Sequence, residues 1–179
     1  MRTEPLIEYI PDQAVDAALD RQLRDLLSIC FVKPGDVVFK ERRFFREPPE
    51  HHWLVRDESV RLIAQVSVHE RALMQDWRRI PIGGIAEVCV HPDCRGRGLV
   101  RHMLHAVHGW LAGREFLFAM LFGKPEVYTT SGYATVSNVW CEEYDAAGLP
   151  HRKPLTPMVC QVGPRPWPVD PVFLPGLTF

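Results

Sequence analysis

The sequence predicts one domain of mixed α/β class spanning residues 1–179, in which helices flank a mixed sheet. Three observations predict it. Val88–Val90 forms an apolar strand pattern that passes through a glycine-rich turn into a helical pattern. Residues 52–72 alternate as an antiparallel hairpin does. Phe116–Phe122 is almost wholly apolar, which is typical of a strand buried on both faces.

Composition narrows the class of protein. Apolar residues make up 46% of the chain and charged residues 24%, as in an ordinary globular protein. A net charge of −1 gives no electrostatic basis for binding nucleic acid or an anionic membrane. No run of 18 apolar residues and no signal-peptide pattern occurs, so we expect a cytoplasmic protein. The five cysteines are scattered without metal-ligand spacing, which predicts reduced thiols and no metal site.

In the first third of the chain, Leu6–Ile10 reads as a short strand ended by Pro11 and Asp12. Asp12 or Gln13 then begins a helix, because apolar residues recur at helical spacing as far as Phe31. Residues 34–50 suggest a second, short amphipathic helix that ends at the pair of prolines 48 and 49. Its Phe44 and Phe45 are apolar residues that suit anchoring in a core.

Beyond the hairpin, a period of two in the apolar residues predicts strands and a period of 3.6 predicts helices. Two further features stand out: a short helix opened by Pro125, which suits a first helical position, and a proline-rich extension that we expect along the domain surface. The expected elements are a charged turn at 74–79, a central strand at 80–90, a helix at 99–111 stopped by Gly113, a strand at 116–122, a helix from 125, strands at 134–144 and 156–162 around a polar loop at 145–154, and the extension at 163–179.

The turn at Arg95–Gly98 has the geometry of an anion site. A strand, a glycine turn and a helix start direct free backbone N–H groups toward one point, and Arg95 and Arg97 add positive charge beside it. Two glycines near a helix start often mark only a tight turn. The motif is neither a P-loop, because no Gly-Lys-Ser/Thr follows, nor a dinucleotide fingerprint, because position 101 is arginine.

The whole run Val-x-Val-His-Pro-Asp-x-Arg-Gly-x-Gly-Leu-Val resembles the GNAT superfamily of acyl-CoA-dependent N-acetyltransferases. Their signature Gln/Arg-x-x-Gly-x-Gly/Ala maps onto Arg95–Val100 and agrees everywhere except at Val100. Val127-Tyr128-x-x-x-Gly132-Tyr133 is similar to a second GNAT pattern, Leu-Tyr-x-x-x-Gly-Phe, and it lies at the expected distance.

This resemblance implies a mostly antiparallel mixed sheet of about six or seven strands with about four helices, and a splayed V between the fourth and fifth strands. It implies transfer of an acetyl group from acetyl-CoA to a primary amine of a small molecule by direct attack. The aminoglycoside 2'-N-acetyltransferases are the nearest subgroup we can name, and a homodimer is possible. The open alternatives are transfer of a longer acyl chain and a non-catalytic module that binds CoA or a partner.

The resemblance also assigns residues. Tyr128 would protonate the leaving thiolate. Phe44 and Phe45 would form part of the acceptor-side wall, and anchoring in the core is an equally good interpretation of them. Glu87 is the candidate base, since a carboxylate in an apolar strand is costly unless it is paired or used; pairing with an arginine or with solvent is the alternative. His102, His105 and His108 are expected on a solvated helix face, and His51 and His52 receive no role. The expected cofactor-binding residues are Val88, Cys89, Val90, Arg95, Gly96, Arg97, Gly98, Leu99 and Val100.

Overall fold

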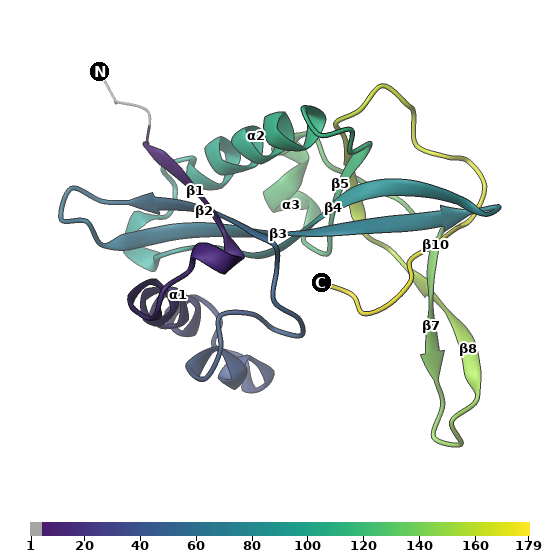
Figure 1. Ribbon diagram of the computed structural model, residues 1–179, viewed down its shortest axis with the longest axis horizontal. Helices are drawn as coiled ribbons and strands as arrows, with labels where there is room; N and C mark the ends of the chain where they lie inside the picture. The colour runs from purple at the N-terminus through teal and green to yellow at the C-terminus, as the bar shows by residue number, and fades with distance from the viewer. Residues whose placement is uncertain (1–4) are drawn as a thin grey trace. The chain divides into compact units, whose positions relative to one another are not determined.

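The computed structural model describes residues 5–179 (Figure 1). The chain divides into two compact units. Of the described residues, the first comprises 5–69 and Ile85–Val107, and the second comprises Glu70–Gly84 and His108–Phe179. Three elements run through both: strands β3 (Leu62–Gln75) and β4 (Arg78–Val90), and helix α2 (Leu99–Ala112). The mixed α/β fold class is confirmed, although the sheet has ten strands among the described residues.

In the first unit, helix α1 packs against an antiparallel sheet. Strand β1 (Ile7–Pro11) pairs with β2 (His51–Arg56), which pairs with β3. Helix α1 (Ala17–Cys30) lies beside this sheet in Figure 1 and buries its apolar face. The buried residues that share this core are Leu19, Leu23, Leu26, Leu27, Phe39, Leu54, Leu62 and Cys89.

The first helix expected in this part of the chain forms but begins later than predicted, and the second is shorter than predicted. Asp12–Ala14 forms only a 3-10 turn, and α1 begins at Ala17 because the Asp16 carboxylate caps it, accepting from the Leu19 N–H at 2.8 Å. Of residues 34–50, only Pro34–Lys40 is helical, again as a 3-10 helix. The segment after it is held by the Arg43 side chain, which donates to Asp12 and Asp20, rather than by helical hydrogen bonds.

In the second unit, hydrogen bonding orders the strands β6-β9-β5-β4-β3-β10-β7-β8. The pairing of β4 with β5 is parallel and joins Ile82–Gly84 to Phe118–Met120. The strands not yet bounded are β5 (Phe118–Leu121), β6 (Ala134–Thr135), β7 (Val139–Tyr144), β8 (Pro150–Leu155), β9 (Met158–Gln161) and β10 (Val172–Phe173). The short helix α3 spans Pro125–Tyr128.

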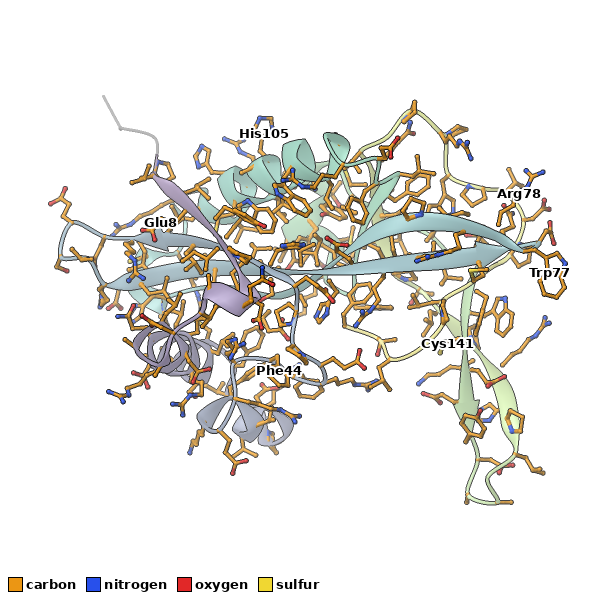
Figure 2. The ribbon with its side chains drawn as sticks, viewed as in Figure 1. Glu8, Phe44, Trp77, Arg78, His105 and Cys141 are labelled. Carbon is orange, nitrogen blue, oxygen red and sulfur yellow. The ribbon has the colours of Figure 1, made fainter. Side chains whose placement is uncertain are left out.

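Two turns of the second unit differ from expectation. The polar loop expected at 145–154 instead contains β8, whose polar residues pair with β7; the Arg152 guanidinium lies 4.3 Å from the Trp140 ring centroid. The β3–β4 turn is only Asp76 and Trp77, both with left-handed backbone, and Figure 2 shows Trp77 projecting from its tip.

The proline-rich extension belongs to the second unit. Its strand β10 pairs with β7 and β3, and Val172 and Leu174 are fully buried. The Phe179 ring lies against Gly84, where a Cβ would be only 2.7 Å from it. No helix among residues 5–179 is long and apolar enough to cross a membrane.

Candidate active site

The glycine turn forms as the sequence predicts. After the 3-10 turn Pro92–Cys94, residues 95–98 are exposed, and Gly96 and Gly98 take left-handed φ values of 73° and 74°. The His102 N–H donates to the Gly98 carbonyl at 3.1 Å, so helix α2 leaves the N–H groups of residues 98–101 without helical partners. No described atom lies within 4 Å of a Cβ placed on Gly96. The turn therefore offers free donors and open space to an anion.

The two arginines of the turn differ in role. Arg95 Nε donates to the Val90 carbonyl at 3.3 Å, so this side chain also ties the turn to the end of β4. Arg97 Nη2 donates to the Asp93 carbonyl at 3.2 Å. Arg97 and Leu99 also line a cavity of about 620 Å³. Its other lining residues are Pro5, Val55, Arg56, Asp57, Glu58, Ser59 and Ile63.

Glu87 interrupts the extended backbone of β4. Its φ is +43°, which is uncommon for a residue other than glycine. Its carbonyl accepts from Gln65 Nε2 at 3.1 Å, and its carboxylate Oε1 accepts from the Phe45 N–H at 3.1 Å. Strained backbone of this kind is retained where neighbouring groups fix it, and it often occurs at active sites.

Burial governs the ionisation of Glu87. Oε2 is buried and accepts no hydrogen bond from the described residues. Desolvation raises the pKa of this carboxyl from 4.5 to about 7, although hydrogen bonds from the Phe45 N–H and the Ser67 side chain oppose the rise. A carboxyl with a pKa near neutrality can both take up and release a proton at physiological pH.

Strands β2 and β3 contribute a group of buried polar residues, one of which, Gln65, donates to the Glu87 carbonyl. Ser67 Oγ is 3.3 Å from His52 Nδ1, and His52 Nε2 is 2.8 Å from Asp12 Oδ1. Arg43 also donates to Asp12, at 2.9 and 2.7 Å. His52, Gln65 and Ser67 have no exposed surface. No functional role for these residues follows from the sequence pattern alone.

Two thiols lie close to the same strand. Cys30 Sγ donates to the Val90 carbonyl at 3.4 Å. A hydrogen bond with Cys89 lowers the pKa of the Cys30 thiol to about 7 against the opposing effect of burial, and the Arg95 charge adds to the lowering. Cys89 itself is buried, and desolvation raises its pKa. No group of three residues able to hold a metal ion occurs among residues 5–179.

The second motif lies in the second unit. Tyr128 ends α3, packs edge-on against Tyr133 at 6.1 Å between ring centroids, and lies over Gly123, where a Cβ would clash with it. Tyr133 is buried and its OH is 2.8 Å from His108 Nε2. His108 therefore does not sit on a purely solvated face, as the helix pattern suggested, whereas His105 is exposed (Figure 2).

Comparison with known proteins agrees with this geometry. The model of the acetyltransferase (GNAT) domain family matches residues 15–136, which include both motifs. The chain belongs to the GNAT family. A search of curated proteins gave no match.

Solved structures show that the fold is that of GNAT proteins. A GNAT family N-acetyltransferase from Escherichia coli, YhbS, solved in complex with CoA, is 16% identical, covers 97% of this chain and 93% of its own, and has a TM-score of 0.64. An acyl-CoA N-acyltransferase from Pseudomonas aeruginosa is 14% identical, covers 88% of this chain and 99% of its own, and has a TM-score of 0.60.

Within this GNAT domain, the functional residues that the sequence did not reveal come from segments that are distant in the chain. One signal was present: His52, Gln65 and Ser67 are polar residues in predicted strands whose neighbours are mostly apolar. Polar groups at such positions require buried partners. The sequence alone does not say which partners those are, because pairing registers are set in three dimensions.

Proposed function

We propose that this protein transfers an acetyl group from acetyl-CoA to a primary amine of a small molecule by direct attack, without a covalent enzyme intermediate. The proposal rests on one observation. Glu87, next to the β4 residues that precede the glycine turn, is a buried carboxyl whose pKa is raised to about 7. An amine attacks a thioester only when it is neutral, so a base that accepts a proton near neutral pH suits the reaction.

Glu87 accepts the proton of the attacking amine, and the Val88 N–H stabilises the oxyanion of the tetrahedral intermediate. Tyr128 protonates the departing thiolate of CoA. The turn formed by Arg95, Gly96, Arg97 and Gly98, with Leu99 and Val100 at the start of α2, holds the pyrophosphate; Val88, Cys89 and Val90 align the pantetheine arm. In support, the turn is exposed, Gly96 is open, and Arg97 borders a cavity of about 620 Å³.

Binding of the donor is tested by calorimetric titration with acetyl-CoA. Wild type should bind in the micromolar range, and Arg97→Ala should weaken binding about tenfold, since a charge-assisted hydrogen bond contributes about 1.5–3 kcal/mol. Arg21→Ala, which removes an exposed arginine from α1, serves as the matched control. If wild type does not bind acetyl-CoA, the enzyme proposal is wrong.

Turnover is tested by screening primary amines, aminoglycosides first, with acetyl-CoA and then with longer acyl-CoA donors. Tyr128→Phe keeps the ring that packs on Tyr133 and removes only the hydroxyl. We expect a loss of at least tenfold in kcat with unchanged acetyl-CoA binding. Binding without transfer to any amine would favour a non-catalytic CoA-binding module instead.

A further inference from the structure

Two buried oxygen atoms, one of them on the candidate base, have no hydrogen-bond donor among the described residues. They are Gln65 Oε1 on β3 and Glu87 Oε2 on β4. Gln65 has no exposed surface, whereas Glu87 is half-buried, so a ligand can approach the two oxygens from the side of Glu87. Buried acceptors almost always have a donor in a folded protein, and an unpaired one is costly. The pair therefore suits a ligand group that carries N–H or O–H donors.

A hydrogen bond fixes the orientation of the Gln65 amide. Gln65 Nε2 donates to the Glu87 carbonyl at 3.1 Å. The reversed amide would place two acceptor oxygens against each other, so the nitrogen must face the carbonyl. Gln65 Oε1 is consequently the free end of an amide that is held next to Glu87, and this end can only accept a hydrogen bond.

The Glu87 carboxyl and the Gln65 amide lie on the same face of the sheet. Gln65 pairs directly with Leu54, so their side chains share one face. The Phe45 N–H donates to Glu87 Oε1 at 3.1 Å, and the Phe45 ring centroid lies 6.1 Å from that of Phe39. Leu54 and Phe39 belong to one buried cluster. Because Phe45 occupies Oε1, Oε2 is the oxygen of Glu87 that is left for a ligand.

We propose that Gln65 Oε1 and Glu87 Oε2 together receive the amino group of the acyl acceptor, an inference that rests on the proposed role of Glu87 as base. A neutral primary amine has two N–H bonds and one lone pair. One N–H donates to Gln65 and the other to Glu87, so the lone pair points away from both oxygens and is free to attack the thioester carbon. As the C–N bond forms and the C–S bond breaks, the proton shared with Glu87 passes from nitrogen to Oε2, and the thiolate of CoA leaves.

The number of N–H bonds makes Gln65 a specificity-determining residue. A neutral secondary amine has one N–H bond and a tertiary amine has none, so either leaves at least one of the two buried oxygens without a donor. A site built to hydrogen-bond a group rejects analogues that lack it, because its own polar atoms stay unpaired. The acceptors are therefore primary amines, and the requirement comes from Gln65 as well as from Glu87.

The test is an NMR titration of the full chain without acetyl-CoA at pH 8, where the Glu87 carboxyl is mostly ionised. The probes are n-butylamine and N,N-dimethylethylamine, which are isomers and are both protonated at this pH. As ammonium ions, the first has three N–H bonds and the second has one, so only n-butylamine can donate to both oxygens. The Gln65 side-chain amide and the Glu87 carboxyl carbon should shift with n-butylamine. Its dissociation constant should be at least about tenfold lower than that of its isomer.

Gln65→Met removes the accepting oxygen and keeps the length of the side chain. In this variant the dissociation constant for n-butylamine, followed at the Glu87 signal, should rise about tenfold and approach that of the isomer. Gln13→Met makes the same change at an exposed glutamine and should leave both constants unchanged. If Gln65→Met does not fold, Glu87→Gln takes its place. Its amide oxygen keeps the Phe45 N–H, so an NH2 group replaces Oε2, and the Gln65 signals should lose their preference for n-butylamine.

Equal dissociation constants for the two amines in the wild type would overturn the proposal, as would a response to neither amine. An unchanged ratio of the two constants in Gln65→Met would also overturn it, because a purely structural role of Gln65 would lower thermal stability without changing that ratio. No acyl transfer enters the titration, so failure of the proposed function would leave these results in place and would be recognised separately. Once transfer is detected, Gln65→Met should raise the KM for the primary amine about tenfold while the KM for acetyl-CoA stays the same.

Discussion

At the scale of single residues, Glu87 is the group on which the proposed chemistry depends. It must be ionised to accept a proton, and its pKa is about 7. Activity should therefore rise with pH, with a midpoint near 7. Glu87→Gln should lower kcat/KM by about 10²–10⁴, because glutamine accepts no proton at any working pH. The rise of activity with pH should also disappear in this variant. Steady-state rates between pH 5.5 and 8.5 measure both effects, and an unchanged profile would remove Glu87 from the mechanism.

The same residue makes folding stability depend on pH. The pKa of Glu87 is higher in the folded state than its ordinary value of 4.5, so the folded protein holds this proton more tightly. The stabilisation is fully present below pH 4.5 and is lost as pH rises through about 7. Between pH 5 and 8, Glu87→Gln should gain on the order of 2–3 kcal/mol in unfolding free energy relative to wild type. Urea unfolding of both proteins at the two pH values measures this, and a pH-independent difference would contradict the shifted pKa.

At the scale of elements, the shape of the glycine turn at residues 95–98 depends on the left-handed backbone conformation of Gly96. Gly96 has a φ of 73° and open space at its Cβ position, so Gly96→Ala adds strain without a clash. We expect a loss of about 1 kcal/mol in stability and weaker acetyl-CoA binding, because the methyl group covers the donors of the turn. Gly35→Ala is the matched control, since that glycine has open space and no left-handed φ. Equal effects of the two substitutions on acetyl-CoA binding would show that the turn does not bind the donor.

The same turn shows why part of the site could be predicted from sequence. Its strand, glycines and helix are consecutive, and the change from a period of two to one of 3.6 marks the boundary directly. The ionic contacts of Arg43 with Asp12 and the pairing of His52 with Ser67 join segments far apart in the chain, and no local pattern encodes them. Strand β8 was missed because its residues are polar and mostly exposed, which gives no alternation to detect.

At the scale of the whole molecule, each compact unit has its own core. Leu23 is fully buried in the first, and Leu174 is fully buried in the second. Strands β3 and β4 continue through both units, so we propose that residues 1–179 unfold as one domain. Leu23→Ala and Leu174→Ala should each cost about 2–5 kcal/mol and shift one common calorimetric transition. Two transitions, each shifted by only one substitution, would contradict this.

The measurement that tests the central proposal most directly is mass spectrometry of isotope-labelled acetyl transfer. Wild type and Glu87→Gln are each incubated with labelled acetyl-CoA and a panel of primary amines at pH 7.5. We predict that wild type attaches one labelled acetyl group to at least one amine, with release of free CoA, and that Glu87→Gln forms this product at least about a hundredfold more slowly. Equal product formation by the two proteins, or acetyl-CoA binding without any acetylated amine, would contradict the proposal that Glu87 is the base of an N-acetyltransferase.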